Sequence, residues 1–520
     1  MKKIVDFIYT FSFLTLKYIS IIFSFMLFLG AFLLSSTDND ITTLKTFVVK
    51  DNIFVGALCL LFFLGLMMLL HHFCKKNPHT TKKILLFVTL GSYTVLGTFL
   101  ILYVKSTPHT DSHFVYSIAK NFAENNFSDI SRDSYLSIYP HQIGLVAFYE
   151  PLIRIWNLTK IPVDAYIFLQ FVNLALVLIF IAFLYKLVNI LFENTYITCS
   201  CLVLTLCCFP LYFYILRIYG DVTSITFLMI GLWAFTKLLT NTQTSQKAKC
   251  KLYLLNIICF ILSVATRKNT IINLIALMLI IALVSLHKKT SGYIPLLLGY
   301  LFIALFTLPL IQLLYETRAN ATLDEGTPAI AYIAMGMEDA PKASGWYNGF
   351  NYNIYLETDH NIEFIESYCK KKIGKKLDYF NSNKDAAIDF YFEKYASQWC
   401  DGTYAFRELT SYSATERSAQ INDFYSENGG KLLLFVCNQL QTILYFGFFV
   451  FSVYNGFFKK EKNVLLYIVV LMAFGGFLFH FLWEANTRAI FSYIVLLLPV
   501  SGAGIATITS PRLNTNFIKK

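Results

Sequence analysis

The sequence has 520 residues, of which 56% are hydrophobic and only 14% carry a charged side chain. Soluble globular proteins are about 45–50% apolar and about 25% charged, so this composition excludes a large water-soluble protein and indicates side chains that face lipid. The formal net charge is +11. In such a chain basic residues gather in cytoplasmic loops, so the excess charge gives no reason to expect a nucleic-acid partner.

Twelve apolar runs are candidates for helices that cross a bilayer, which takes about 20 residues; the seventh is short. They cover residues 11–35, 52–73, 84–104, 166–190, 196–215, 222–240, 252–266, 270–286, 293–315, 431–457, 463–482 and 489–508. The first run follows Lys2 and Lys3, as a signal peptide would. It is long, however, and no small-residue cleavage site precedes Thr37, so we expect a retained helix. The predicted fold is an all-α polytopic membrane protein with about twelve transmembrane helices.

Basic residues in the short connections fall on one side of this predicted bundle. With a cytoplasmic N-terminus, the inward connections and the C-terminal tail carry Lys75, Lys76, Lys82, Lys83, Lys247, Lys249, Lys251, Lys288, Lys289, Lys459, Lys460, Lys462, Arg512, Lys519 and Lys520. This is the distribution that the positive-inside rule describes. We therefore expect a cell-membrane protein with both termini in the cytoplasm. Residues 1–104 would form the N-terminal helices, 166–315 a transmembrane core and 431–520 the C-terminal helices.

Two long segments, residues 105–165 and 316–430, then lie on the extracytoplasmic face. In the first, the apolar spacing of DSHFVYSIAKNFAENNF predicts an amphipathic helix on the membrane surface. A second apolar helix is expected after Tyr139-Pro140-His141; the alternative is a plain spacer. The second segment is long enough for a small folded domain.

Cysteine usage adds one open question. Nine of the eleven cysteines lie in or beside apolar runs, where a thiol behaves as a small hydrophobe. Cys369 and Cys400 lie in the second long segment, where an oxidising compartment would permit a disulfide if the fold brings them together. No group of cysteines and histidines has the spacing of a zinc site.

Charged residues recur at the outer ends of the predicted spans, where an ionisable group costs free energy and usually has a partner or a task. Four outer turns present Asp111 and His113 (PHTDSHF), Arg217 and Asp221 (LRIYGD), Arg267 and Lys268 (ATRKN), and Glu484 and Arg488 (EANTR). One interpretation is ordinary interfacial charge, with basic side chains snorkelling to water. Because outward turns should be poor in basic residues, we favour an anionic ligand such as a phosphate or diphosphate.

The order of these motifs and their common side resemble the GT-C superfamily of integral-membrane glycosyltransferases, including the protein O-mannosyltransferase and aminoarabinose-transferase relatives. The resembling pieces are an Asp after an early span, an amphipathic helix followed by Tyr-Pro-His, the turns LRIYGD and ATRKN, and the late EANTRAIFSYIVLLLP. The resemblance implies a GT-C-like fold. It also implies an enzyme that moves a sugar, with inversion, from a polyprenyl-phosphate or diphosphate donor to an acceptor hydroxyl on the extracytoplasmic face.

By this resemblance Asp111 is the general base that takes the acceptor proton as the new bond forms. Glu124, Asp129 and Asp133 are alternative bases in the same loop. The candidates for binding the donor phosphate or sugar are His113, Tyr139, His141, Arg217, Asp221, Arg267, Lys268, Glu484 and Arg488. Many family members carry two adjacent acidic residues where this chain has Asp-Ser-His, and two spans precede the one that leads to Asp111. We expect no cofactor and no required metal.

Other functions remain open from the sequence. A surface-polysaccharide polymerase or ligase would also have about twelve spans, a large late outer loop and outward arginines that bind a lipid diphosphate, but no early catalytic carboxylate. A transporter is less favoured, because it would place ionisable residues within spans and show related halves. The expected partners are a polyprenyl-phosphate-sugar donor, the lipid bilayer and a glycan, lipid or protein acceptor. Residues 316–430 lie where an acceptor-recognition domain would be inserted, and their aromatic residues suit stacking on sugar rings and an ordinary domain core equally well.

Overall fold

The computed structural model describes residues 2–37, 46–240, 245–288, 290, 292–459 and 463–510. In this part of the chain ten helices are long and apolar enough to cross a membrane. They are α1 (Lys2–Leu33), α2 (Ile53–Lys76), α3 (Pro78–Val104), α7 (Ala165–Phe192), α10 (Asp221–Thr240), α11 (Gln246–Thr266), α12 (Ile271–Lys288) with η2 (Lys268–Thr270), α13 (Ile294–Ala319), α20 (Glu427–Val453) with η3 (Tyr454–Phe458), and α21 (Ile468–Leu482) with η4 (Val464–Tyr467). The prediction of an all-α, multi-pass membrane protein is confirmed.

The other two predicted runs are not single helices, so the described residues contain ten spans, or eleven if one bent pair is counted as a span, where the sequence predicted about twelve. Residues 489–508 become the bent pair α22 (Thr487–Leu496) and α23 (Leu498–Thr509), whose axes meet at 55°. Residues 196–215 become two short helices, α8 (Thr195–Leu206) and α9 (Phe209–Tyr214). A proline lies in the first turn of the second helix in each pair, Pro499 in α23 and Pro210 in α9. Because proline has no N–H and its ring collides with the preceding turn, neither run continues as one straight helix.

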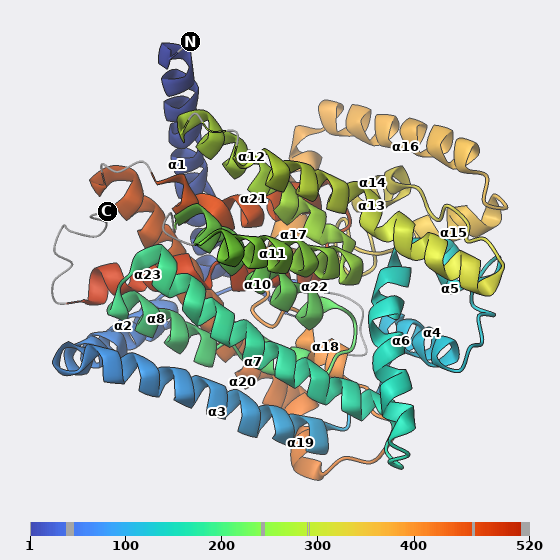
Figure 1. Cartoon of the computed structure of the whole chain (residues 1–520), viewed down its shortest axis with the longest axis horizontal. Helices are drawn as coiled ribbons and strands as arrows, with labels where there is room; N and C mark the ends of the chain where they lie inside the picture. Colours follow the sequence, from blue (N-terminus) through green and yellow to red (C-terminus); the bar gives the residue numbers. More distant parts are fainter. Residues whose placement is uncertain are drawn as a thin grey trace.

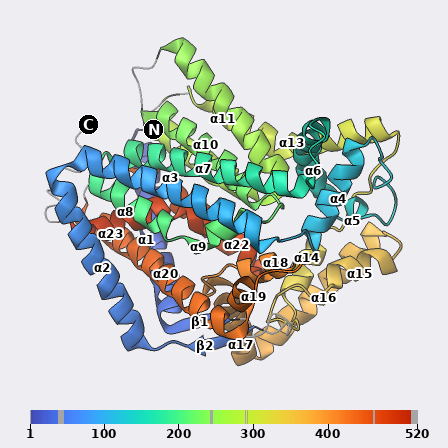
Figure 2. The same ribbon diagram turned by 90° about the horizontal axis from the view of Figure 1, so that it is seen from below.

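The segment between α3 and α7 contains the two helices expected there. They are α4 (Asp111–Ala123) and α6 (Ile143–Leu158), separated by α5 (Tyr135–Ile138) and η1 (Pro140–Gln142). Val115, Ile118 and Phe122 lie on the buried face of α4, which packs on α6. Figures 1 and 2 both place α4, α5 and α6 at the right of the molecule, opposite α2 and α8, so this segment lies at one end of the bundle.

Residues 320–426, which we call the inserted segment, are helical where they are regular. They contain α14 (Ala329–Gly336), α15 (Phe350–Glu357), α16 (Ile362–Ser382), α17 (Lys384–Trp399), α18 (Phe406–Ser411) and α19 (Ala419–Tyr425). A short antiparallel ribbon that the sequence did not predict, β1 (Leu34–Thr37) with β2 (Phe47–Lys50), packs on α17.

The disulfide that the sequence left open is not formed. All eleven cysteines lie in the described residues and are free thiols. Cys369 is buried in α16 beside Ala331 and Tyr355, whereas Cys400 caps α17 and accepts a backbone hydrogen bond from Ser36. Cys400 is not part of the cluster that surrounds Cys369.

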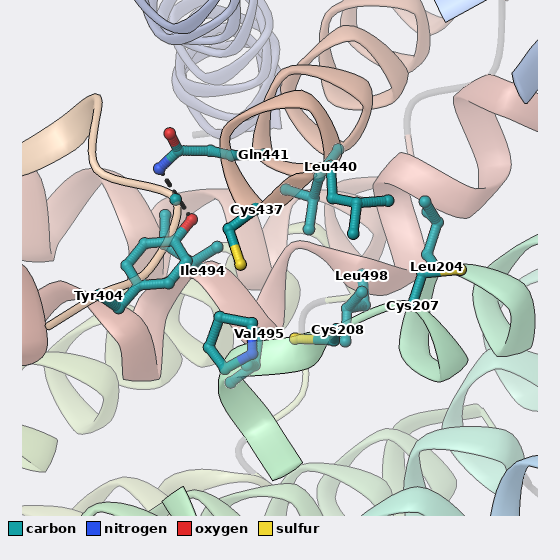
Figure 3. A pocket seen from close by; sticks show the side chains of 13 residues that line it. Leu204, Cys207, Cys208, Tyr404, Cys437, Leu440, Gln441, Ile494, Val495 and Leu498 are labelled. Atoms are coloured by element: carbon teal, nitrogen blue, oxygen red, sulfur yellow. Dashed lines mark hydrogen bonds between the residues drawn. The ribbon is translucent and has the colours of Figure 1, made fainter. Parts of the chain in front are cut away.

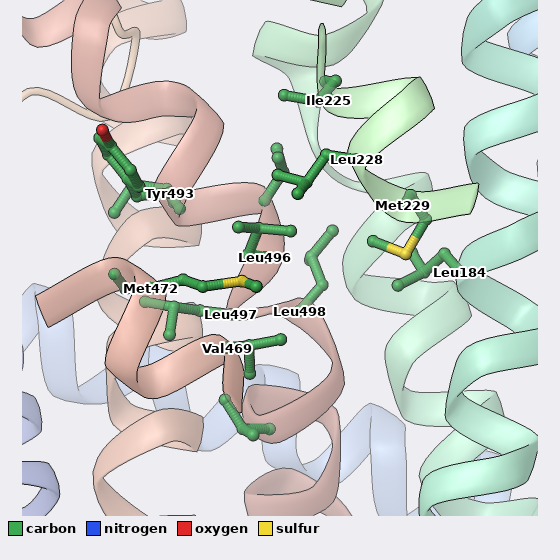
Figure 4. Close-up of a cluster of buried hydrophobic side chains, with 14 of the residues drawn as sticks. Leu184, Ile225, Leu228, Met229, Val469, Met472, Tyr493, Leu496, Leu497 and Leu498 are labelled. Carbon is green, nitrogen blue, oxygen red and sulfur yellow. The ribbon is translucent and has the colours of Figure 1, made fainter. Parts of the chain in front are cut away.

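The bundle has inner and outer helices. Figure 4 shows the centre, where Leu184 of α7, Leu228 of α10, Met472 of α21 and Leu496 of α22 meet. Helices α2, α3 and α13, in contrast, expose large apolar side chains along much of their length, as expected for a surface that faces lipid. The charged turns described next lie at the ends of the inner helices.

Candidate functional site

Asp111 is the first residue of α4 and follows span α3 by a short loop. Its side chain is 42% exposed, and Oδ2 lies 4.0 Å from Nη1 of Arg488 in α22. The unpaired N–H groups at a helix N-terminus favour a carboxylate at this position. The carboxylate is therefore partly open to solvent and lies beside a fixed positive charge.

Two arginines from different turns lie against the ring of Tyr219. The guanidinium carbon of Arg488 is 4.7 Å from the ring centroid, and that of Arg217 is 5.2 Å from it. Cation–π attraction favours both positions. The Tyr219 hydroxyl accepts a hydrogen bond from Nε2 of Gln142, 2.7 Å away, which ties this ring to η1. Three segments far apart in the sequence thus meet at one tyrosine.

Arg217 is the least satisfied charge in the site. Its side chain is only 2% exposed, and Nε, Nη1 and Nη2 make no hydrogen bond to any described residue. Burial lowers the pKa of its guanidinium to about 10, with Arg488 adding repulsion and Asp111 opposing it, so the group stays cationic at neutral pH. A buried cation without hydrogen bonds costs free energy unless an anion joins it.

Arg267 has its own partner. Its guanidinium forms an ion pair with the buried Asp221 carboxylate and donates from Nη2 to the carbonyl of Ala489, 3.4 Å away. Burial lowers the pKa of Arg267 to about 10, and the charge of Arg488 lowers it further. Asp221 therefore neutralises Arg267, and Arg267 joins the starts of α10 and α22 to the turn after α11.

Glu484 lies in the turn between α21 and α22. Burial raises the pKa of its carboxyl to about 7, and the charge of Arg488 opposes that rise. Asp111 raises the pKa as well, which shows that the two carboxyl groups act on each other. The site therefore contains a second acidic group that changes protonation near neutral pH.

Lys268 and the Tyr139-Pro140-His141 segment complete the rim. Burial lowers the pKa of His141 to about 4 and Lys268 lowers it further, so this imidazole is neutral at pH 7 and can both donate and accept a hydrogen bond. Lys268 is exposed in η2. The Tyr139 hydroxyl shares a hydrogen bond with Tyr347 of the inserted segment, and burial raises its pKa.

His113 and the alternative bases lie elsewhere. The His113 side chain is exposed, and its ring centroid lies 5.9 Å from that of its neighbour Phe114. Glu124 follows the far end of α4, roughly 20 Å from Asp111 by helical rise. Asp129 accepts a hydrogen bond from Asn121, and Asp133 pairs with His360. Asp111 is thus the acidic residue of this loop that lies with the arginines.

Several aromatic residues of the site were not predicted from the sequence, because they carry no charge that would distinguish them from other aromatic residues. Tyr135 shares a hydrogen bond with Tyr219, and Tyr332 of α14 stacks on Trp483 at 5.0 Å. The available signal for Tyr219 was its position between Arg217 and Asp221 in LRIYGD. The sequence placed the inserted segment on the same face but did not indicate which of its residues reach the site, because that depends on long-range packing.

A small apolar cavity, with a volume of about 30 Å³, lies beside the break between α8 and α9 (Figure 3). It is lined by residues from the α8–α9 break, α20, α22 and the start of α23, including Cys208, Leu440 and Val495. Tyr404 on its wall accepts, through its backbone carbonyl, a hydrogen bond from Tyr214, three residues before Arg217. One hydrogen bond thus links the wall of this small cavity to the segment that carries Arg217.

Residues 1–506 match the model of a family described as conserved hypothetical integral membrane protein. The chain belongs to this family. A search of curated proteins gives no match. The membership agrees with the helices described above and establishes a multi-pass integral membrane protein in contact with the lipid bilayer.

Proposed function

We propose that this protein is a membrane glycosyltransferase that transfers a sugar from a polyprenyl-phosphate donor to an acceptor hydroxyl. The observation that carries the proposal is the meeting of an accessible carboxylate, Asp111, with two arginines, of which Arg217 is buried and without a hydrogen-bond partner among the described residues. Such a site suits a reaction that needs a base and produces a phosphate anion.

In the proposed step, the acceptor oxygen attacks the anomeric carbon from the face opposite the phosphate. Asp111 takes the hydroxyl proton as the new C–O bond forms. The bond between the anomeric carbon and the phosphate oxygen breaks, and polyprenyl phosphate leaves with the electron pair. Arg217 and Arg488 stabilise the charge that develops on that phosphate, and the sugar inverts its configuration.

The remaining residues have supporting roles in this proposal. His141, Tyr139 and Glu484 offer hydrogen-bonding groups to sugar hydroxyls, and Lys268 adds positive charge at the rim. The Arg267–Asp221 pair keeps the turns in place. Aromatic rings such as Tyr347, which is 49% exposed, suit stacking on a glycan acceptor.

The distribution of lysines supports a site on the extracytoplasmic face. The lysine-rich connections lie at the ends of the helices opposite these turns, which by the positive-inside rule favours cytoplasmic termini and a site in the cell envelope.

A polysaccharide polymerase or ligase remains the second candidate, because Arg217 and Arg488 would also suit a lipid diphosphate. The accessible carboxylate beside them favours the glycosyltransferase. The two are separated by the donor that is consumed, a single lipid-linked sugar or a lipid-linked oligosaccharide.

Asp111→Asn tests the proposal. We expect loss of sugar transfer from a polyprenyl-phosphate donor by about 10²- to 10⁴-fold, the usual contribution of a general base. Transfer is measured with radiolabelled lipid-linked sugar in membrane vesicles. Asp129→Asn, in the same loop but away from the arginines, is the matched control and should retain activity. Full activity in Asp111→Asn would remove the base from the proposal.

A further inference from the structure

The turn that carries Glu484 is held mainly by the inserted segment. The amide of Ala485 donates to the carbonyl of Gly345 at 2.7 Å, and Nε2 of Gln398 donates to the carbonyl of Asn486 at 3.1 Å. A parallel β-bridge joins Trp346 to Ala485. The position of this turn therefore depends on residues about 90 to 140 places earlier in the chain, at a site whose other charges come from the spans.

Lys394 of α17 is central to this contact. Its side chain is 2% exposed, and Nζ donates to the carbonyls of Trp483, at 2.8 Å, and Gly336. A Cβ on Gly336 would lie 2.5 Å from the carbonyl carbon of Trp483. Gly345, with φ of +75°, would place a Cβ 2.7 Å from Cδ of Lys394. Both glycines permit the close approach that buries the ammonium beside the turn.

The same ammonium acts on Glu484 electrically. Burial lowers the pKa of Lys394 to about 7, and Glu484 opposes that change. Burial raises the pKa of Glu484 to about 7, and Lys394 is among the groups that lower it. One buried lysine thus contacts the backbone of the turn and biases the protonation of its carboxyl group.

We propose that Lys394 is a positioning residue through which the inserted segment sets both the place and the charge of Glu484. The effect of Lys394 on sugar transfer rests on the proposed function. The effect of Lys394 on the position and protonation of Glu484 does not. The inserted segment then does more than offer a surface to the acceptor, because an acceptor that displaces α17 also changes an acidic group of the site.

Other groups on the elements packed around Glu484 also change its pKa or bond to its backbone. A test of Lys394 has to leave these residues unaltered. They are Arg488 of α22, Asp111 of α4, Tyr332 of α14, Tyr347 of the inserted segment, Asn486 of the same turn, and His480 of α21, whose ring bonds to the Glu484 carbonyl oxygen. Lys394→Met and Lys394→Gln change none of these residues.

Infrared pH titration of the full-length protein in lipid nanodiscs tests the coupling. The band of the protonated Glu484 carboxyl is assigned by its loss in Glu484→Gln. In the unaltered protein its midpoint is expected near pH 7. Lys394→Met removes the neighbouring positive charge, so the midpoint should rise by roughly one pH unit. Lys372→Met, which removes a lysine paired with Glu338 in the same segment, should leave the midpoint unchanged.

A midpoint in Lys394→Met equal to that of the unaltered protein would overturn the proposal. Lys394→Gln serves if the methionine variant does not fold, since its amide can keep a hydrogen bond without the charge; the same upward shift is expected. Placement is tested with Gln398→Leu, in which hydrogen exchange at the Ala485 amide should speed up; unchanged exchange would exclude a role of this contact in holding the turn.

Sugar transfer gives a separate readout. If Lys394 positions the site, Lys394→Met should lower kcat by about 100-fold, as small displacements of reacting groups do, with little change in the KM for the donor. Should the unaltered protein transfer no sugar, the proposed function fails while the infrared shift still stands. An infrared shift with unchanged kcat would overturn the positioning role of Lys394.

Discussion

Two buried arginines of the site, Arg217 and Arg267, differ in whether a carboxylate neutralises their charge. Arg267 forms an ion pair with Asp221, whereas Arg217 makes no hydrogen bond to any described residue and only rests on the ring of Tyr219. The first arrangement is typical of a residue that holds structure. The second costs free energy in the ligand-free protein, and such a cost is usually retained for binding.

This difference gives opposite expectations for two methionine variants. Arg217→Met should leave thermal stability in detergent unchanged or raised and weaken binding of undecaprenyl phosphate by about 30-fold or more, because a desolvated charge pair with the phosphate is lost. Arg267→Met should destabilise the protein by about 3–5 kcal/mol, since it leaves Asp221 buried without its counter-charge. Melting curves and lipid binding measured on both variants decide this; equal destabilisation would mean that Arg217 is a structural residue.

Glu484 should make stability depend on pH. Its folded-state pKa, about 7, lies above the ordinary value of 4.5. The stabilisation is therefore fully present below about pH 4.5 and is lost as pH rises through 7, because the folded state holds a proton that the unfolded state releases. Glu484→Gln cannot lose that proton, so its apparent Tm relative to the unaltered protein should rise between pH 5 and pH 8. Parallel Tm curves would show that the carboxyl group is not shifted.

The charged members of the site were predictable from the sequence, because a charge at the end of an apolar run stands out. Arg217 and Glu484 are of this kind. Tyr219 and Lys394 were not predicted, since an aromatic ring or a lysine in a polar segment resembles many others. Their roles arise from contacts between segments more than 80 residues apart in the chain, as Lys394 and Trp483 show.

At the scale of elements, glycines set how closely the inner helices approach. Gly504 of α23 faces the backbone of Gly447 in α20, and a Cβ at either position would meet the other helix's carbonyl oxygens. Small residues at such crossings let helices pack through van der Waals contact in lipid, where apolar burial drives association only weakly.

Gly504→Ala should therefore force α20 and α23 apart. Overpacking of this kind costs about 1–3 kcal/mol, seen as a lower melting temperature in detergent. Gly65→Ala in α2 is the control, because a Cβ there meets nothing within 4 Å; it should be neutral or slightly stabilising. A similar loss in both variants would point to a general effect of helix composition and not to the α20–α23 contact.

The length of an apolar run predicted the position of a helix correctly where that helix is straight. The run at 196–215 was long enough for a span, but Pro210 divides it into α8 and α9, and the prediction of one helix was too simple. The β1–β2 ribbon had no strong alternating pattern to indicate it, and its contact with α17 supplies part of its stability. Short strands held by tertiary contacts are poorly marked in a sequence.

At the scale of the whole molecule, the proposed orientation can be checked with one variant. Lys371→Cys puts a thiol on α16, where the lysine is exposed, and the native Cys250 is exposed near the start of α11, at the opposite end of the helices. A membrane-impermeant maleimide added to intact cells should label position 371 and spare Cys250. Labelling of Cys250 alone would reverse the orientation and place the site in the cytoplasm.

The burial of α22 and α23 has a consequence for synthesis. Nearly every residue of α23 is buried, and the helix packs against α2, α7, α8 and α20, all of which are made before it. The packed centre around α23 is therefore complete only when the α22–α23 pair has joined these earlier helices. Arg488 enters with that pair. A ribosome that stops before it would leave in the membrane a chain that has most of its spans but neither a packed centre nor the arginine beside Asp111.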